Sequence, residues 1–254
     1  MMQKLKKLSV RQVLFSISVV LILTGFIVVD FSKAKDENIV INIDEKNGYY
    51  FVTKDDVVRL IDEIKFEHPT ASRLNRIELK SIEEKLKSID FVLDAQVSRD
   101  LKGNLIINIE QDQPIARLIG NNGDGGYISR DRDLLNLSDG YAARVMLISG
   151  SGADSLLKSE FLHSEQGKEL CEFVEYINSE PFWRAMVTQL DLDSDMDITI
   201  YPQIGKQRFE FGKSEGYLKK LKKMQTFYDE IVPKKGWGEY KVVKLQYEGQ
   251  IVCK

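Results

Sequence analysis

The sequence predicts an α+β protein with three parts: a single N-terminal transmembrane helix, a small β-α-α-β-β domain, and a larger, mostly antiparallel β domain with flanking helices. Three observations indicate this class. An uncharged apolar run occupies 13–29, strand and helix periodicities follow one another in 38–112, and short alternating runs separated by Gly and Pro turns fill 113–254. In the small domain, this order predicts helices on one face of a three-stranded sheet.

The first part is the predicted membrane anchor, over 13–31. The 17 uncharged residues of 13–29 span roughly 25 Å as a helix, near the lower limit for crossing a bilayer. We expect the anchor to include Val13, Leu14, Leu21, Ile22 and Val29. The preceding tail, 1–12, carries four basic residues and no acidic one, so the positive-inside rule predicts a cytoplasmic tail and an exported remainder.

Two other interpretations of this apolar run were considered. Ser32-Lys33-Ala34 fits the small-x-small pattern of a cleaved signal peptide, but the run is longer than the usual apolar core of such a peptide. A buried core helix is disfavoured, because a helix that is apolar on all sides needs a shell of protein around it. The anchor and the signal peptide both predict that the bulk of the chain lies across the membrane.

The charge distribution bears on the class of partner. The chain has a formal net charge of -3, and the tail contributes four positive charges, which leaves -7 for the remainder. An acidic exported part argues against nucleic acid as a partner. The two cysteines, Cys171 and Cys253, are too few for a disulfide framework, and whether they pair stays open.

The small domain, 38–112, is predicted from five successive patterns. An alternating run at 38–44 indicates a half-buried strand. Capping boxes at 53–56 and 81–84 each precede a stripe of apolar residues at helical spacing, so they predict two amphipathic helices. Two further alternating runs, 95–99 and 105–109, flank a turn that contains a glycine, which predicts a hairpin.

This module, directly outside a single N-terminal anchor, resembles a POTRA domain. The run 82–118 is similar to the bacterial cell-division proteins of the FtsQ/DivIB family. The similarity is carried by Phe91-Val92, by Gly103-x-Leu105-x-Ile107-x-Ile109, and by the exit Gln113-Pro114-Ile115-Ala116. The resemblance implies that this domain helps to recruit the protein to the division septum.

The second domain, 113–254, is predicted to begin at Pro114, which cannot donate to a strand ladder. The patterns predict a hairpin around 131–133, a strand at 144–148, a helix over 164–177, strands at 187–192, 197–201 and 207–211, a helix over 217–231, and a final long strand at 240–252. Four lysines crowd one side of the last helix (Lys219, Lys220, Lys222 and Lys223). A solvated face is the simplest interpretation of them, and contact with an acidic partner or lipid head groups is the alternative.

No catalytic or metal-binding pattern is evident. Neither His68 nor His163 stands at metal-ligand spacing to another His or Cys. The alternating aspartates of 191–197 begin like a calcium loop, but Met196 and Pro202 stand where that loop needs Gly and Glu, so we expect a turn between strands. We therefore expect a binding protein, not an enzyme, without a cofactor.

The final strand is the expected binding element. It ends two residues before the chain does, so we expect an open sheet edge that another chain completes by strand addition. Val243, Leu245 and Tyr247 should then face one side, and Lys244 and Gln246 the other. We expect backbone pairing to supply the affinity for the partner, and these side chains, Val243 and Leu245 included, to supply the specificity.

The end of the second domain also resembles the FtsQ/DivIB family, through Phe211-Gly212, the Lys-rich helix, Gly236-Trp237 and Leu245-x-Tyr247-x-Gly249-Gln250. The resemblance implies a non-catalytic, single-pass scaffold of the divisome in the cytoplasmic membrane, with its C-terminal bulk in the periplasm at the septum. It implies that the last strand and the preceding helix receive an extended segment of FtsB, which is coiled with FtsL. The candidate contacts are Gln246, Tyr247, Gly249 and Gln250. Trp237 is a weaker candidate, and core packing at the corner between the helix and the strand is the alternative for it. The alternatives are an exported cell-wall enzyme and an outer-membrane assembly factor that share the POTRA-like module.

Overall fold

The computed structural model describes residues 38–45, 48, 50–67, 76–138 and 140–254. The predicted tail, 1–12, and the predicted anchor, 13–31, lie outside the described residues. Within the described ranges, no helix combines the length and the apolar character that crossing a membrane requires.

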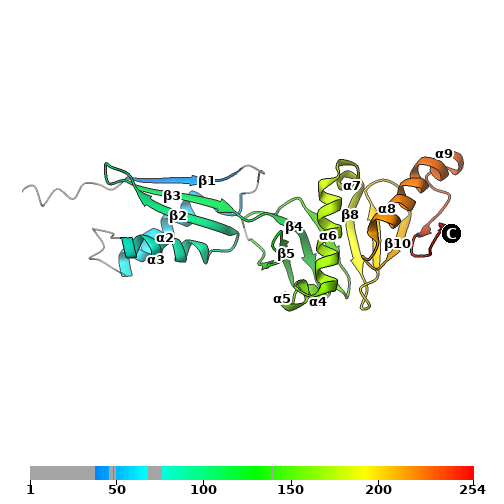
Figure 1. The fold of residues 1–254 in the computed structure, drawn as a ribbon, viewed down its shortest axis with the longest axis horizontal. Coiled ribbons are helices and arrows are strands. Elements are labelled where there is room, and N and C mark those ends of the chain that lie inside the picture. Colours follow the sequence, from blue (N-terminus) through cyan, green and yellow to red (C-terminus); the bar gives the residue numbers. More distant parts are fainter. Residues whose placement is uncertain (1–37, 46–47, 49, 68–75, 139) are drawn as a thin grey trace, which may run out of the picture.

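The first domain has the predicted order of elements. Its described elements are β1 (Ile39–Ile43), α2 (Lys54–Glu67), α3 (Arg76–Lys87), β2 (Val92–Arg99) and β3 (Leu105–Gln111). The strand order is β1-β3-β2, in which β1 runs parallel and β2 antiparallel to the central β3. Both helices lie on one face of this sheet (Figure 1).

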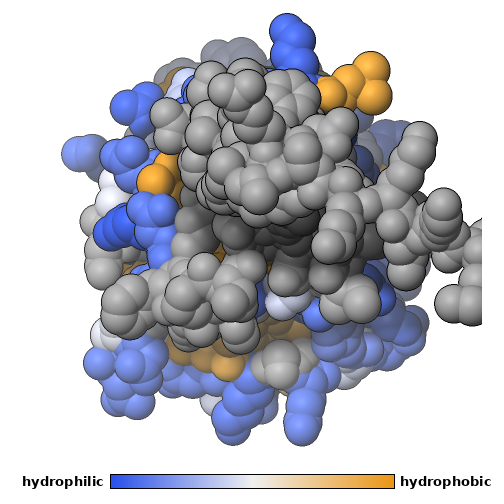
Figure 2. Space-filling view, turned by 90° about the vertical axis from the view of Figure 1, so that its left-hand side faces the viewer, coloured by the Kyte–Doolittle hydropathy of each residue, from blue (hydrophilic) through white to orange (hydrophobic). Residues whose placement is uncertain are grey.

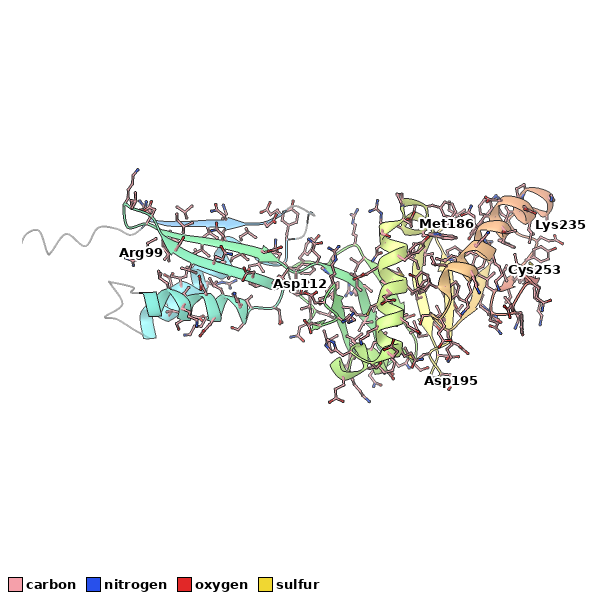
Figure 3. All side chains as sticks on the ribbon, viewed as in Figure 1. Arg99, Asp112, Met186, Asp195, Lys235 and Cys253 are labelled. Carbon is pink, nitrogen blue, oxygen red and sulfur yellow. The ribbon has the colours of Figure 1, made fainter. Side chains whose placement is uncertain are left out.

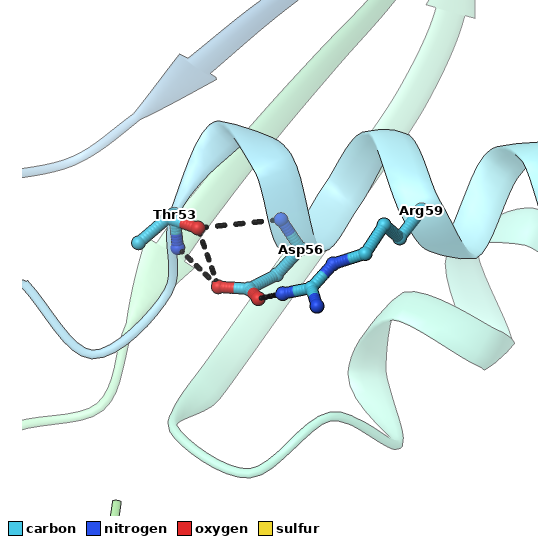
Figure 4. Close-up of polar contacts among 3 residues, drawn as sticks. All are labelled: Thr53, Asp56 and Arg59. Atoms are coloured by element: carbon cyan, nitrogen blue, oxygen red, sulfur yellow. Dashed lines mark hydrogen bonds and ion pairs between the residues drawn. The ribbon is translucent and has the colours of Figure 1, made fainter. Parts of the chain in front are cut away.

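The predicted capping box at the start of α2 is confirmed (Figure 4). The Asp56 carboxylate accepts hydrogen bonds from the Thr53 amide at 2.9 Å and the Thr53 hydroxyl at 2.6 Å, and it pairs with Arg59. Burial opposes the ionisation of Asp56, but the bonds from Thr53 and Arg59 outweigh it and lower the pKa of this carboxyl. The helix therefore starts at a fixed point, which directs Val57 and Ile61, both fully buried, into the core.

The β2–β3 hairpin turns as the glycine pattern predicts. The Asp100 carboxylate accepts from the amides of Lys102 and Asn104, each at 2.8 Å, and Gly103 adopts a φ of 91°. Leu101, at the tip of this turn, is fully exposed. Figure 2 views this end of the molecule; most of the coloured residues around its rim are hydrophilic, and hydrophobic ones appear at the upper right, at the left and in a recessed area below the centre.

The second domain is built on a nine-stranded sheet of order β12-β11-β10-β9-β8-β7-β4-β5-β6. The strands are β4 (Pro114–Ile119), β5 (Gly125–Ser129), β6 (Leu134–Leu135), β7 (Met146–Ser149), β8 (Val187–Leu192), β9 (Ile198–Pro202), β10 (Arg208–Gly212), β11 (Val242–Lys244) and β12 (Val252–Cys253). The β4–β7, β7–β8 and β10–β11 pairs are parallel, and the other pairs are antiparallel. The prediction of a mostly antiparallel sheet is therefore confirmed.

Helices accompany this sheet. They are α4 (Ala153–Leu156), α5 (Ser159–Leu162), α6 (Glu165–Ser179), α7 (Pro181–Met186), α8 (Tyr217–Thr226), the π-helical turn η2 (Phe227–Ile231) and α9 (Val232–Lys235). In Figure 1, α6 and α8 lie across the sheet. Phe173 of α6 stacks on Phe211 of β10 with ring centroids 4.9 Å apart, and both side chains are fully buried. Such aromatic pairs contribute both burial and geometric specificity to the core.

Aromatic residues from both domains pack together at the junction. Phe51 and Phe91 stack with ring centroids 3.8 Å apart, and Tyr127 of β5 meets both rings edge-on at 5.5 and 5.8 Å. The Tyr141 hydroxyl donates to the carbonyl of Gly48 at 3.0 Å. The first domain therefore buries apolar surface against the second domain.

The long axis of the molecule separates two regions. Arg99, near the β2–β3 turn, lies at one end, and Cys253 and Lys235 lie at the other, with Asp112 between them at the domain junction (Figure 3). The chain enters β1 at the end that carries the β2–β3 turn (Figure 1). The C-terminal end of the second domain is therefore the part farthest from the start of β1.

Candidate functional site

The prediction of one continuous strand over 240–252 is wrong. The chain forms β11, leaves the sheet after Leu245, and returns antiparallel as β12, with Val243 opposite Cys253 and Lys244 opposite Val252. Strand β11 thus has β10 on one side and β12 on the other. The expectation that this strand forms an open edge is corrected accordingly: the edge of the sheet is the two-residue β12.

A backbone conformation and a pair of hydrogen bonds explain why the chain leaves the sheet. Gly249 has a φ of 68°, a left-handed conformation that other residues adopt at a cost, and it lies in the reversal between β11 and β12. The Lys223 ammonium of α8 donates hydrogen bonds to the main-chain carbonyls of Leu245 and Tyr247. Because these carbonyls bond to a side chain, the segment after Leu245 turns toward α8.

The structure divides the predicted binding residues into two groups. Val243 and Leu245 are fully buried in the core of the second domain, so the prediction that their side chains face a partner is wrong. Tyr247 is 41% exposed, and Gln246, Gly249 and Gln250 are exposed beside it. We call Gln246, Tyr247, Gly249, Gln250 and Trp237 the C-terminal surface.

A cavity of about 610 Å³ connects this surface to α8. Its lining includes Gln246, Gly249 and Gln250 from the C-terminal segment, and Lys219, Lys220 and Lys223 from the helix. These lysines recur at the three- and four-residue spacing that places side chains on one face of a helix. Our simplest interpretation assigned them to a solvated face, and this spacing is the signal that could have linked them to the site.

Burial shapes the charge at this cavity. Burial lowers the pKa of Lys223, an effect that the nearby Glu248 carboxylate opposes. Burial also lowers the pKa of Lys220, and the charge of Lys223 adds to that effect. The Lys220 ammonium donates to the carbonyl of Lys213 at 2.6 Å and lies 5.2 Å from the centre of the Phe211 ring. The cavity wall therefore carries three lysines and two carboxylates, Glu215 and Glu248. Main-chain contacts hold Lys220 and Lys223, and Lys220 also lies over an aromatic ring.

Trp237 lies at the same end of the domain. Its ring is tilted by 41° against Tyr228 with centroids 5.8 Å apart, yet the residue is 48% exposed. Burial raises the pKa of Tyr228 to about 12, so this phenol stays neutral beneath the indole. A half-exposed tryptophan on a fixed base is a common anchor at protein interfaces.

Strand β12 offers a free backbone edge next to these side chains. Lys254 exchanges hydrogen bonds with Val242, at 2.9 and 3.1 Å. Because bonding direction alternates along an antiparallel strand, Val252 and Lys254 bond inward, and the amide and carbonyl of Cys253 turn outward. The outer edge of the sheet is therefore available for pairing with another strand.

Other candidate groups form structural contacts. The Asp193 carboxylate accepts from the amides of Asp195 and Asp197, each at 2.9 Å, which forms the predicted turn between β8 and β9. His163 lies 3.6 Å from the Asp133 carboxylate, and His68 lies outside the described residues. Over the part of the chain that the structure covers, no three His, Cys, Asp or Glu residues are grouped as metal ligands.

These features define a two-domain protein in which a POTRA-like module precedes a β domain with an exposed C-terminal edge. A family model for a POTRA-like domain matches residues 35–110, and a family model described as FtsQ/DivIB, C-terminal related, matches residues 113–254. The chain belongs to the FtsQ/DivIB family. A search of the curated proteins finds no match. Membership of this family supports a division-related scaffold role. The family is generally non-enzymatic.

Proposed function

We propose that this chain is a single-pass scaffold of the divisome that binds the FtsB/FtsL complex at its C-terminal surface. In this proposal the helix over 13–31 anchors the protein in the cytoplasmic membrane, and the two domains extend into the periplasm at the septum. In the same proposal, the exported part consists of the POTRA-like domain, 38–112, and the β domain, 113–254. The POTRA-like domain assists recruitment to the septum.

The observation that carries the proposal is the convergence at the C-terminal end. The exposed Tyr247 and Trp237, the lysine-lined cavity and the outward backbone edge of Cys253 come from separate segments and lie at one end of the domain. A sheet edge flanked by pockets is the arrangement that strand addition uses, because main-chain bonds give affinity and the pockets give specificity.

The contacts assign a role to each part. An extended segment of FtsB pairs with the outer edge of β12, as an added strand. Its apolar side chains pack against Tyr247 and Trp237, while its carboxylates approach Lys219 and Lys220 across the cavity. The buried Val243 and Leu245 support this surface from the core and do not contact the partner.

Co-purification from membranes tests the proposal. The full chain and a variant that lacks Val252–Lys254 are each expressed with FtsB and FtsL, and circular dichroism verifies that both are folded. We expect the truncated chain to lose the complex, because it lacks the strand that receives the partner. Recovery of FtsB and FtsL at the level of the full chain would contradict the assignment of the binding edge.

A further inference from the structure

A second cavity, of about 690 Å³, lies at the end of the nine-stranded sheet's parallel part where β4, β7 and β8 begin. Its lining includes Gln113 and Val187. Figure 3 labels the residues directly before these two, Asp112 and Met186, which locate the cavity in the molecule. None of the C-terminal surface residues contributes to it. The cavity is therefore separate from the site described above.

The cavity has an apolar floor and a basic rim. Its buried lining residues include Ile115, Met146 and Val187, at the starts of the three parallel strands. The exposed lining residues include three arginines from three different segments: Arg130, Arg144 and Arg184. Only one carboxylate, Glu175, belongs to the same lining.

These arginines lack close counter-charges within the described part of the protein. No salt bridge there includes Arg130, Arg144 or Arg184, although Arg130 interacts at longer range with Asp112. The chain as a whole carries more acidic than basic residues, 39 against 36. Three guanidinium groups against one carboxylate in the lining of one cavity are therefore a local reversal of the overall charge.

The polar groups between the arginines are fixed. Asn178, near the end of α6, donates from its side-chain amide to the carbonyl of Ile115 at 2.8 Å, which ties the helix to the start of β4. The Ser179 hydroxyl donates to the carbonyl of Tyr176 at 2.8 Å. The wall on this side of the cavity is thus held by main-chain contacts, which lowers the entropy cost of binding a ligand.

We propose that this cavity binds an acidic peptide segment of another protein. Guanidinium groups bind carboxylates through paired, charge-assisted hydrogen bonds, so Arg130, Arg144 and Arg184 recognise Asp or Glu side chains. An apolar side chain of the same segment covers Ile115, Met146 and Val187. A free phosphate ion would satisfy the arginines but leave this floor open to water, so the chemistry of the lining favours the peptide.

Selection from a random peptide display library tests this proposal on the full chain. We expect the selected peptides to be enriched in Asp and Glu next to an apolar residue. We expect the double variant Arg144→Glu/Arg184→Glu to bind the selected peptides at least about tenfold more weakly in fluorescence polarisation, because two attractions become repulsions. The matched control Lys206→Glu reverses an exposed charge outside this cavity and should bind as the unmodified chain does.

Three results would overturn the proposal: selected peptides without acidic enrichment, selected peptides that bind the double variant as tightly as the unmodified chain, or displacement of every bound peptide by equimolar inorganic phosphate. The last result would assign the site to a free phosphate. Arg144→Lys and Arg184→Lys keep the charge but lose the planar fork, so they should retain part of the affinity if the variants fold normally. The binding of FtsB and FtsL should be unchanged in all of these variants, which separates this test from that of the proposed function.

Discussion

Lys223 of α8 donates a hydrogen bond from its ammonium group to the main-chain carbonyl of Tyr247, at a distance of 2.7 Å. The same ammonium bonds to the carbonyl of Leu245, where the chain leaves the sheet. One side chain therefore connects the Lys-rich helix to the segment that carries the exposed candidate contacts. Lys223 therefore positions the main chain at Tyr247, although Lys223 itself is only partly exposed.

Replacing Lys223 tests this positioning role. Lys223→Met keeps most of the aliphatic stem but removes both bonds, so we expect a loss of about 1 kcal/mol in the free energy of unfolding, since these charge-assisted bonds are only partly buried. Amide hydrogen exchange should become faster over 245–251. Lys222→Met, on the exposed neighbouring position, is the matched control and should leave both quantities unchanged. Equal exchange in the two variants would show that Lys223 does not hold this segment.

Gly249 provides a test of the chain reversal. A Cβ atom at this position would meet no atom within 4 Å, so the cost of Gly249→Ala comes from its φ of 68° alone. We expect a destabilisation of about 1 kcal/mol. Gly238→Ala, which also adds a Cβ into open space but without a positive φ, is the control and should not be destabilising. Thermal unfolding of the three proteins measures the difference, and equal midpoints would contradict a left-handed residue 249.

Cys253→Pro tests the outward edge of β12. Proline removes the amide that points away from β11, while the inward bonds between Lys254 and Val242 remain. We expect near-normal stability and at least about tenfold weaker binding of FtsB and FtsL, because the added strand loses a main-chain bond and proline obstructs its approach. Val252→Pro is the converse variant: it removes an inward amide and should lower stability. Normal binding by a folded Cys253→Pro protein would contradict strand addition at this edge.

The buried Asp112 at the domain junction predicts a dependence of stability on pH. Burial raises the pKa of this carboxyl, and the charges of Asp131 and Asp133 add to the effect, while the Gln113 amide and Arg130 oppose it. Because the pKa is higher in the folded than in the unfolded state, the ionised carboxylate destabilises the fold at neutral pH. This penalty is lost as pH falls through the raised pKa toward the ordinary value of 3.8.

Asp112→Asn should therefore raise the unfolding midpoint at pH 7, and the gain should shrink as the pH approaches 4. The side-chain oxygen of the substituted amide can still accept the bond that the Gln113 amide now donates at 2.6 Å. Asp124→Asn, at an exposed carboxylate, controls for the change in net charge. Thermal unfolding across this pH range measures the effect, and a gain that does not depend on pH would exclude ionisation as its cause.

Local patterns predicted much of the fold. The capping box at Thr53 and the predicted helix after Ser164 are both present, because a cap and an apolar stripe depend on residues close in sequence. Strand β4 was not predicted: Pro114 indicated only a boundary, yet it begins a strand whose partners β5 and β7 lie farther along the chain. Such pairings are set by tertiary contacts.

The candidate site shows the same limit. Alternation over 240–252 predicted one strand, because periodicity depends only on which residues are apolar. It contains no information on the hydrogen bonds from Lys223 to the main chain, which turn the segment after Leu245 away from the sheet. The exposure of Tyr247 agrees with its predicted place at a surface, whereas Val243 and Leu245 belong to the core. For Trp237 the sequence left core packing open, and the residue is 48% exposed. The lysine-lined cavity depends on the packing of α8 against the reversal, which the sequence alone does not specify.

The most direct test of the account is the affinity of the full chain for the FtsB/FtsL complex when Tyr247 is replaced by glutamate. Tyr201→Glu is the matched control, because Tyr201 is 40% exposed, close to the 41% of Tyr247, and lies on β9, outside the C-terminal surface. We predict at least about tenfold weaker binding for Tyr247→Glu with an unchanged unfolding midpoint, and normal binding for Tyr201→Glu. Binding of Tyr247→Glu at the affinity of the unmodified chain would contradict the C-terminal surface as the partner site.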